Sequence, residues 1–319
     1  MKLNSWGLRI RLWLAMVLLF GLVYVILLVA GTLLDFGGYE FYAALGLGVV
    51  LLQYLIGPII VQSSMNVEYV SETEEPELHR IISDLAMSAG IPKPKVGISN
   101  INIPNAFAFG RTKKDGRVCV TKGLLNKLNK EELKAVLAHE IAHIKHSDMA
   151  VTTLVSAVPL ICYFIAISFF YGGNSRNSGG FIIGILAFGA YLLGQLIVLF
   201  VSRTREYYAD QGSIELGGRP EKLASALYKL VYDSATANKE EVKNIQGIKA
   251  FCLNDVSVAA NEINELSQLD IDHDGEISAS ELSQLKYKKV NIKTSDKLME
   301  LISTHPNMLK RIERLAEYS

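Results

Sequence analysis

Four long apolar runs alternate with polar stretches along the chain. They occupy Leu12–Leu34, Phe41–Val61, Val151–Tyr171 and Phe181–Val201, and each reaches the ~20 residues that a helix needs to cross a bilayer. A short polar loop joins the first run to the second, and another joins the third to the fourth. The pattern therefore predicts four transmembrane helices in two hairpins, with Pro58 kinking the second helix or lying near its end. For the second hairpin, buried core helices are the alternative, and its full or partial crossing stays open.

Basic residues flank these runs unevenly. They precede the first run and follow the last, at Lys2, Arg9, Arg11, Arg203 and Arg205. In the two hairpin loops the only basic residue is Arg176. Because cytoplasmic loops carry the excess of Lys and Arg, we predict a multi-pass cell-membrane protein whose termini and polar part are cytoplasmic.

The second hairpin divides the polar part into two pieces, about 66–150 and 203–319. In the first piece the patterns predict a helix at Glu74–Ser88 and strands at Pro92–Asn100, Asn105–Gly110 and Arg117–Thr121. The alternating Asn105–Gly110 segment is typical of an edge strand. After these strands, Asn129 and Glu132 form a capping-box pattern that starts another helix.

Composition adds few constraints. Half of the residues are apolar and the formal net charge is zero, so nothing in the charge balance indicates a nucleic-acid partner. The cysteines, Cys119, Cys162 and Cys252, are scattered and odd in number. They form neither a disulfide framework nor a CxxC metal motif, which fits a reducing compartment.

The helix that follows the strands contains His139-Glu140-Ile141-Ala142-His143, an HExxH motif. Residues i and i+4 share one face of a helix, so both imidazoles can reach one zinc ion. Glu140 lies beside them and can take a proton from a water molecule that the metal activates. The alternative is two ordinary helix histidines beside a surface glutamate.

Strands followed by such a helix are the layout expected of a zincin metalloprotease, whose edge strand can bind an extended peptide. The predicted class is an α+β integral membrane protein: four transmembrane helices plus a mainly helical, zincin-like cytoplasmic metalloprotease domain with a small β-sheet. The predicted boundaries are 1–65 and 151–202 for the hairpins, with 66–150 and 203–319 for the protease domain.

A catalytic zinc site usually has three protein ligands and one open position. Beyond the last apolar run, Glu206 and Asp210 are one helical turn apart. Glu206 can bind the metal, and Asp210 can accept a hydrogen bond from a ligand histidine. Acidic residues on an exposed helix are usually solvated, so spacing alone leaves this assignment open. His146 is a rival ligand, although its spacing from His143 favours a place at the membrane surface.

The chain resembles the HtpX family of membrane-bound zinc metalloproteases and, more distantly, the CAAX prenyl proteases. The resemblance is carried by the HExxH motif, the apolar hairpin after it and the sequence Ser202-Arg203-x-x-Glu206-x-x-Ala209-Asp210. Pro104–Gly110 is similar to that family's substrate-side strand, and Thr304–Ile312 to its C-terminal motif. At Asn307 the family usually has a second proline, which is a mild departure.

The resemblance implies Glu206 as third zinc ligand and Asp210 as a support behind a ligand histidine. It also implies that His305 and Arg311 lie near the active site, where His305 either stabilises an oxyanion catalytically or, with Arg311, only holds the C-terminal helix. The residues that it implies for substrate binding are Asn105, Ala106, Phe107 and Ala108.

The activity implied is that of a zinc metalloendopeptidase with one zinc per chain and Glu140 as its base. The HExxH helix ends shortly before Val151, so the site is expected close to the cytoplasmic membrane surface. Misfolded membrane proteins or cytoplasmic polypeptides are the substrates expected, in a quality-control role at the lipid bilayer.

One stretch departs from the family pattern and matches an EF-hand calcium loop, within an insert at about 258–290. The positions that supply ligands in such a loop are filled by Asp270, Asp272, Asp274, Glu276, Ser278 and Glu281. Gly275 takes the sharp turn and Ile277 the apolar position. The alternative is a solvated acidic turn. We expect calcium to bind here and to tune proteolysis, or else to stabilise the fold alone.

Three classes of function compete at this point. A zinc membrane endopeptidase leads. A CAAX-type processing protease needs a chamber of more membrane helices than the predicted four, and a calcium-responsive scaffold conflicts with the intact HExxH motif.

Overall fold

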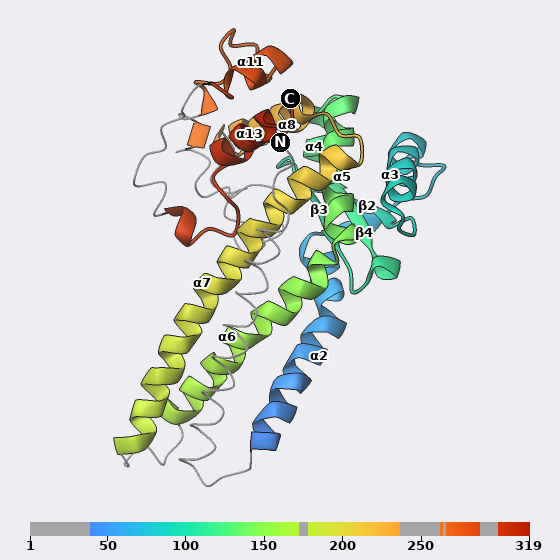
Figure 1. Ribbon diagram of the computed structural model, residues 1–319. Helices are drawn as coiled ribbons and strands as arrows, with labels where there is room; N and C mark the ends of the chain where they lie inside the picture. The colour runs from blue at the N-terminus through green and yellow to red at the C-terminus, as the bar shows by residue number, and fades with distance from the viewer. Residues whose placement is uncertain (1–38, 172–177, 237–261, 264–265, 288–298) are drawn as a thin grey trace. The chain divides into compact units, whose positions relative to one another are not determined.

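A computed structural model describes residues 39–171, 178–236, 262–263, 266–287 and 299–319 (Figure 1). Apart from Met1, the chain divides into two compact units, one of residues 58–149 with 203–319 and the other of residues 2–57 with 150–202. The first predicted span, Leu12–Leu34, lies outside the described residues, as do residues 258–261, 264–265 and 288–290 of the predicted EF-hand-like insert.

The described fold is mostly helical with one small sheet. Its helices are α2 (Tyr39–Ser64), α3 (Pro76–Ala89), α4 (Lys122–Lys127), α5 (Lys130–Lys145), α6 (Asp148–Tyr171), α7 (Ser178–Glu215), α8 (Pro220–Thr236), α11 (Ala279–Gln284) and α13 (Met308–Ala316), with a 3-10 turn at Lys113–Asp115. Its strands are β1 (Val67–Tyr69), β2 (Lys95–Ser99), β3 (Ala106–Phe109) and β4 (Arg117–Thr121).

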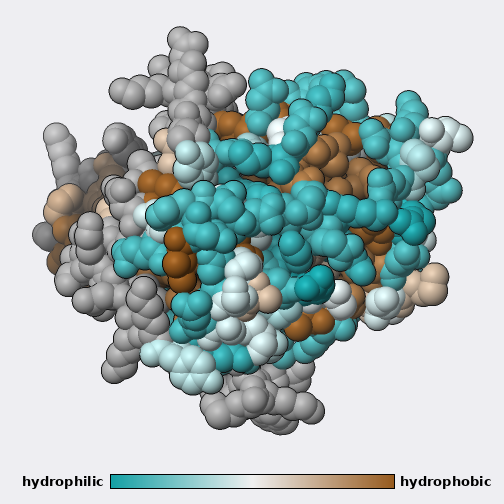
Figure 2. Space-filling view, turned by 90° about the horizontal axis from the view of Figure 1, so that it is seen from above, coloured by the Kyte–Doolittle hydropathy of each residue, from teal (hydrophilic) through white to brown (hydrophobic). Residues whose placement is uncertain are grey.

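Helices α6 and α7 are long and apolar enough to cross a membrane, over Asp148–Ile167 and Gly180–Glu215. Large apolar side chains along them are exposed, among them Phe164 and Leu193 at 48% and 56%. Such a surface suits lipid better than water. The face seen from above in Figure 2 differs, because its coloured residues are mainly hydrophilic with smaller hydrophobic areas. Two of the four predicted spans are therefore supported as candidates. Helix α2 contains Pro58, and its apolar part, Leu51–Ser64, is shorter than a membrane-spanning helix requires.

The sheet has the strand order β1-β2-β4-β3 and is mixed. Strands β2 and β4 are parallel, while β1 pairs antiparallel with β2, and β3 antiparallel with β4. The prediction that the Asn105–Gly110 segment forms an edge strand is confirmed. Gly97 lets the strands come close, because a Cβ there would lie 2.7 Å from Val67 Cγ1. The sequence reading missed β1, which has only three residues.

Helix α5 carries the HExxH motif through the core of its unit. It packs against α3, α8 and strand β3 (Figure 1). Apolar side chains bury it on nearly all sides: Ala135, Val136, Leu137, Ala138, Ile141, Ala142 and Ile144. The predicted capping box is present, since Asn129 accepts from the Glu132 backbone N–H and Glu132 accepts from that of Asn129. A rigid, buried helix thus presents the histidines.

The C-terminal part of α7 approaches α5 closely at one glycine. A Cβ built on Gly212 would lie 2.5 Å from the Cβ of Ala142, closer than atoms can pack. Beside it, the Ser213 hydroxyl donates to the Ala135 carbonyl at 2.8 Å. This contact holds Glu206 and Asp210, which lie on the same helix, next to the HExxH helix.

We expect Gly212→Ala to lower stability and metal affinity. In a helix interior, alanine is normally more stable than glycine by about 1 kcal/mol. Overpacking costs about 1–3 kcal/mol, and at this close contact we expect that cost to exceed the gain in helix propensity. The matched control is Gly189→Ala on the same helix, where nothing lies within 4 Å of the new Cβ. Thermal unfolding in detergent should fall for the first variant only. Equal behaviour of both would contradict the close approach.

Candidate active site and metal centre

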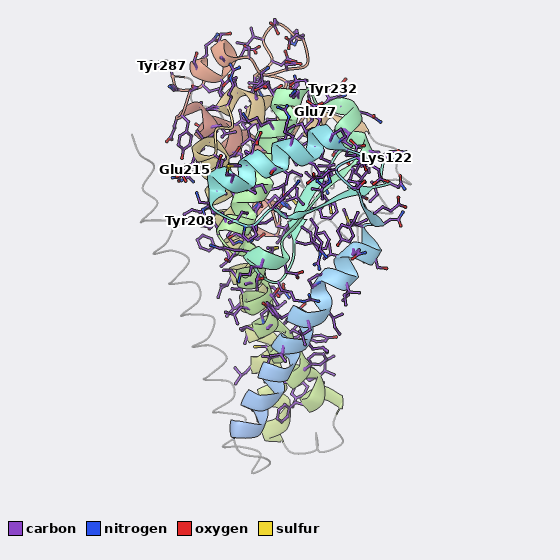
Figure 3. All side chains as sticks on the ribbon, turned by 90° about the vertical axis from the view of Figure 1, so that its right-hand side faces the viewer. Glu77, Lys122, Tyr208, Glu215, Tyr232 and Tyr287 are labelled. Atoms are coloured by element: carbon purple, nitrogen blue, oxygen red, sulfur yellow. The ribbon has the colours of Figure 1, made fainter. Side chains whose placement is uncertain are left out.

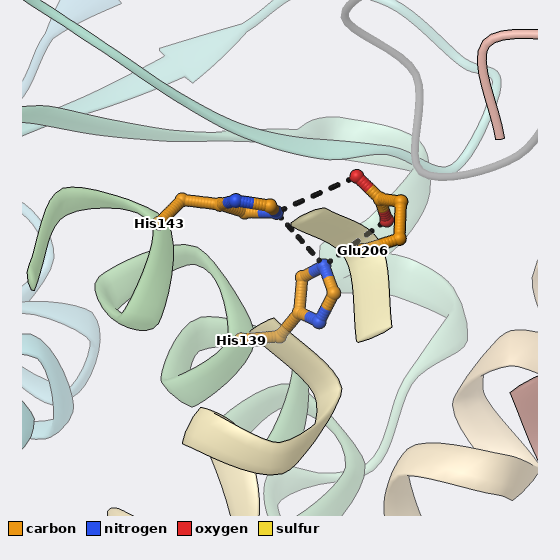
Figure 4. Close-up of side chains that lie close together, drawn as sticks. All are labelled: His139, His143 and Glu206. Atoms are coloured by element: carbon orange, nitrogen blue, oxygen red, sulfur yellow. Dashed lines mark hydrogen bonds and ion pairs between the residues drawn. The ribbon is translucent and has the colours of Figure 1, made fainter. Parts of the chain in front are cut away.

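Three side chains meet at one point, His139 and His143 from α5 and Glu206 from α7 (Figure 4). The two imidazole Nε2 atoms are 3.1 Å apart. Glu206 Oε2 lies 3.5 Å from His139 Nε2, and Oε1 lies 3.6 Å from His143 Nε2. All three groups are buried or half-buried. The arrangement can hold a metal ion.

The far side of each imidazole faces a carboxylate. His143 Nδ1 lies 2.6 Å from Asp148 Oδ2, and His139 Nδ1 lies 3.0 Å from Asp210 Oδ1. A proton on each Nδ1 is therefore stabilised, and both Nε2 atoms then direct lone pairs at the same place. At 3.1 Å the two Nε2 atoms need either a shared proton or a cation between them, so the donor set fits a bound metal.

Electrostatics around His139 favour a positive charge. Burial lowers the pKa of His139, but its contacts with Asp210 and Glu206 outweigh that effect and raise the pKa to about 9. In the metal-free protein at pH 7 this imidazole therefore holds an extra proton, which a metal must displace.

Glu140 is buried beside the three groups, at 3% exposure. Burial raises the pKa of this carboxyl above its ordinary value, although the two histidines oppose the shift. A backbone hydrogen bond links it to Ala108 on strand β3. A carboxylate with a raised pKa is a stronger base than one in water, which suits proton transfer.

A buried arginine stands behind Glu206 and Asp210. Arg311, on α13, is 0% exposed. It donates from Nε and Nη2 to the two oxygens of Asp210, at 2.9 and 2.6 Å, and its Nη1 lies 3.1 Å from Glu206 Oε2. The prediction that Asp210 and Arg311 lie near the site agrees with this geometry.

His305 also borders the cluster. Its Nε2 lies 4.0 Å from Glu206 Oε1, and its Nδ1 lies 2.9 Å from the Thr304 hydroxyl. His146 is not part of the cluster: its exposed ring lies beside Tyr208 (labelled in Figure 3), with 6.2 Å between ring centroids.

The side chains of the predicted substrate strand are largely internal. Asn105, Ala106 and Phe107 are buried, and Ala108 is half-buried. Phe107 and Phe109 pack with Val61, Met65 and Cys119. These side chains are therefore occupied in the core, and β3 is the edge strand of the described sheet.

Asp148 is a site residue that the sequence reading missed. It is buried, pairs with His143, and has its other oxygen 3.1 Å from Arg205 Nε. A signal was available: an acidic residue shortly after HExxH, where the next helix begins.

The acidic loop before α11 brings three aspartates together. The ligand atoms of Asp270, Asp272 and Asp274 lie within 4.8 Å of one another. Gly275 has a φ of +83°, and its N–H donates to Asp270. Glu281 accepts from the Ile271 N–H at 2.7 Å.

An HExxH helix joined by a glutamate from a later helix defines the class of this protein as a metallopeptidase. The model of peptidase family M48 matches residues 72–319. The chain belongs to that family, as an HtpX-like membrane metalloprotease.

Its relatives agree. A protease HtpX homolog of Methanothermobacter thermautotrophicus is 65% identical over 230 residues, covering 72% of this chain and 88% of that protein. One of Pyrococcus furiosus is 41% identical over 232 residues, covering 70% and 79%. The crystal structure of S. mikatae Ste24p shares the fold, with a TM-score of 0.51 and 18% identity over 97% of this chain and 66% of that one.

Proposed function

We propose that the chain is a zinc-dependent membrane endopeptidase, with zinc held by His139, His143 and Glu206. The observation that carries this proposal is the convergence of two imidazole Nε2 atoms and one carboxylate beside the buried Glu140. Two histidines and one glutamate are a known ligand set of catalytic zinc, which keeps a fourth position open.

The separations of the donor atoms suit zinc. Bonds of about 2.0–2.1 Å at tetrahedral angles place neighbouring donors about 3.3 Å apart. The corresponding distances are 3.1, 3.5 and 3.6 Å. Small side-chain adjustments would therefore complete the site.

The residues around the site have separate tasks in peptide hydrolysis. When bound, zinc lowers the pKa of water towards ~7 and polarises the scissile carbonyl. Glu140 takes the proton of the attacking water and returns it to the leaving amine. We assign His305, whose Nε2 lies 4.0 Å from Glu206 Oε1, to donate to the developing oxyanion. The backbone edge of β3 from Asn105 to Ala108 aligns an extended substrate by strand addition.

The substrates we propose are misfolded membrane proteins and cytoplasmic polypeptides at the membrane surface. The positions of Asp148 and Arg203 in the sequence support a site near the membrane surface, because they directly adjoin the apolar parts of α6 and α7. A membrane-tethered unfolded segment should be cut faster than the same segment free in solution, in proteoliposomes. Equal rates would contradict a membrane-surface substrate.

For the acidic loop we propose calcium as the ligand. Every ligand position of the EF-hand pattern is filled between Asp270 and Glu281, and three aspartates so close together repel one another without a cation.

A half-buried lysine offers a route from this loop to the catalytic helix. Lys229 on α8 lies 2.7 Å from Glu276 Oε1 in the loop and 2.8 Å from Glu132 Oε1 at the start of α5. Glu132 is fully buried and also accepts from Ser225. A change in the loop can thus alter the N-terminal cap of the helix that carries HExxH.

We expect calcium to change casein cleavage in the wild type and not in Lys229→Met, with calcium binding retained in both. Lys222→Met is the matched control, because Lys222 also approaches Glu276, at 3.9 Å, from the same helix. Calcium binding is measured by calorimetry and cleavage by peptide release, with zinc kept saturating. A calcium effect that survives Lys229→Met would contradict this route, and one on stability alone would indicate a structural ion.

A further inference from the structure

Each of the two site histidines has its own carboxylate–arginine pair. His139 faces Asp210, which Arg311 holds, and these residues belong to the motifs already described. On the other side His143 faces Asp148, at 2.6 Å, and Asp148 faces Arg205, at 3.1 Å. Asp148 and Arg205 are 4% and 9% exposed. The second pair is the counterpart of the first.

A tight turn brings Asp148 under the histidine. Helix α5 ends at Lys145 and α6 begins at Asp148. Between them Ser147 adopts a left-handed backbone, with a φ of 58°. The chain therefore reverses within a few residues of His143, and the first residue of α6 reaches back to its ring. Arg205 arrives from α7, directly before Glu206.

We infer that Asp148, held by Arg205, is a positioning residue that fixes the orientation and tautomer of His143 for metal binding. The inference rests on the proposed zinc site. A carboxylate that accepts Nδ1–H leaves the lone pair on Nε2, and this nitrogen is the one that lies 3.1 Å from His139 Nε2.

The two oxygens of Asp148 have different partners, which makes a sharp variant available. Oδ2 faces His143 and Oδ1 faces Arg205. In Asp148→Asn one of these atoms becomes an NH2 group. Arg205 cannot accept a hydrogen bond, so the amide oxygen turns to Arg205 and the NH2 turns to His143. It then donates to Nδ1 and drives the imidazole proton onto Nε2, where it competes with zinc.

Zinc affinity, measured by competition with a chromogenic chelator on the full-length protein in detergent, tests this inference. Asp148→Asn should lower the affinity by about 10–100-fold, the usual cost of losing such a support. Arg205→Met alone should lower it less. In the double variant the amide is free to turn its oxygen to His143, so part of the loss from Asp148→Asn should be regained.

The controls separate positioning from folding. Asp115→Asn removes the charge of another aspartate, one that forms ion pairs with Arg111 and Arg117. This control variant should bind zinc with unchanged affinity. Circular dichroism reports folding, and the visible spectrum of the cobalt-loaded protein reports the ligand geometry, which should change in Asp148→Asn.

Two outcomes overturn the inference while the proposed function stands: wild-type zinc affinity in Asp148→Asn, or a double variant that binds zinc no better than Asp148→Asn. If the wild type binds zinc and Asp148→Asn weakens that binding, yet the wild type cleaves nothing, the proposed function fails and the positioning role stands.

Discussion

Glu140→Gln is expected to reduce peptide cleavage by about 10²–10⁴-fold, the usual contribution of a positioned general base. Glutamine keeps the shape of the side chain and cannot take a proton. The carboxyl is buried, and its pKa is raised by that burial, so the variant lacks a strong base at a position where bulk water cannot replace it. The effect should fall on kcat, measured by single-turnover cleavage of a fluorogenic peptide.

Zinc content separates this role from a structural one. Glu140 is not among the three grouped donors, so the variant should keep one zinc per chain. Glu131→Gln, an exposed acid on the same helix, should cleave like the wild type. Cleavage retained in Glu140→Gln would exclude Glu140 as the base, and loss of zinc there would move it into the ligand set.

Arg311→Met is expected to destabilise the protein by about 3–5 kcal/mol, the usual cost of removing one partner of a buried ion pair. Arg311 is 0% exposed and contacts two carboxylates, Asp210 and Glu206. Without the guanidinium both must be buried as uncompensated charges or become protonated. A protonated Glu206 is a poor metal ligand, so zinc affinity should fall with stability.

Arg314→Met on the same helix provides the comparison. Arg314 lies over the Tyr207 ring, 4.7 Å from its centroid. Both residues are half-buried, and a contact of that kind is worth about 0.5–2 kcal/mol. Thermal unfolding and zinc content should change strongly for Arg311→Met and weakly for Arg314→Met. A small effect at Arg311 would mean that the two carboxylates are solvated or neutral.

Local patterns made the main helix predictable. The HExxH spacing and the capping box depend only on residues within a turn or two, and the structure has both in the helix Lys130–Lys145. The extension of the last apolar helix beyond Val201 was likewise predictable, because no proline interrupts it before Glu215.

Contacts between distant elements were harder to predict. Spacing alone left Glu206 open, and the family resemblance supplied it, since nothing local shows that Gly212 lets two helices touch. Asp148 was missed because its place depends on the left-handed turn at Ser147. The burial of Phe107 was missed because an alternating strand does not reveal which face packs inward.

The measurement that tests the central claim most directly is casein cleavage by the detergent-purified chain after zinc is stripped and restored. 1,10-Phenanthroline removes zinc while calcium stays in the buffer, so the acidic loop is not disturbed. We predict that cleavage disappears on stripping and returns with one equivalent of zinc per chain. Cleavage that persists in the stripped protein, or fails to return although zinc binds, would contradict a zinc peptidase at this site.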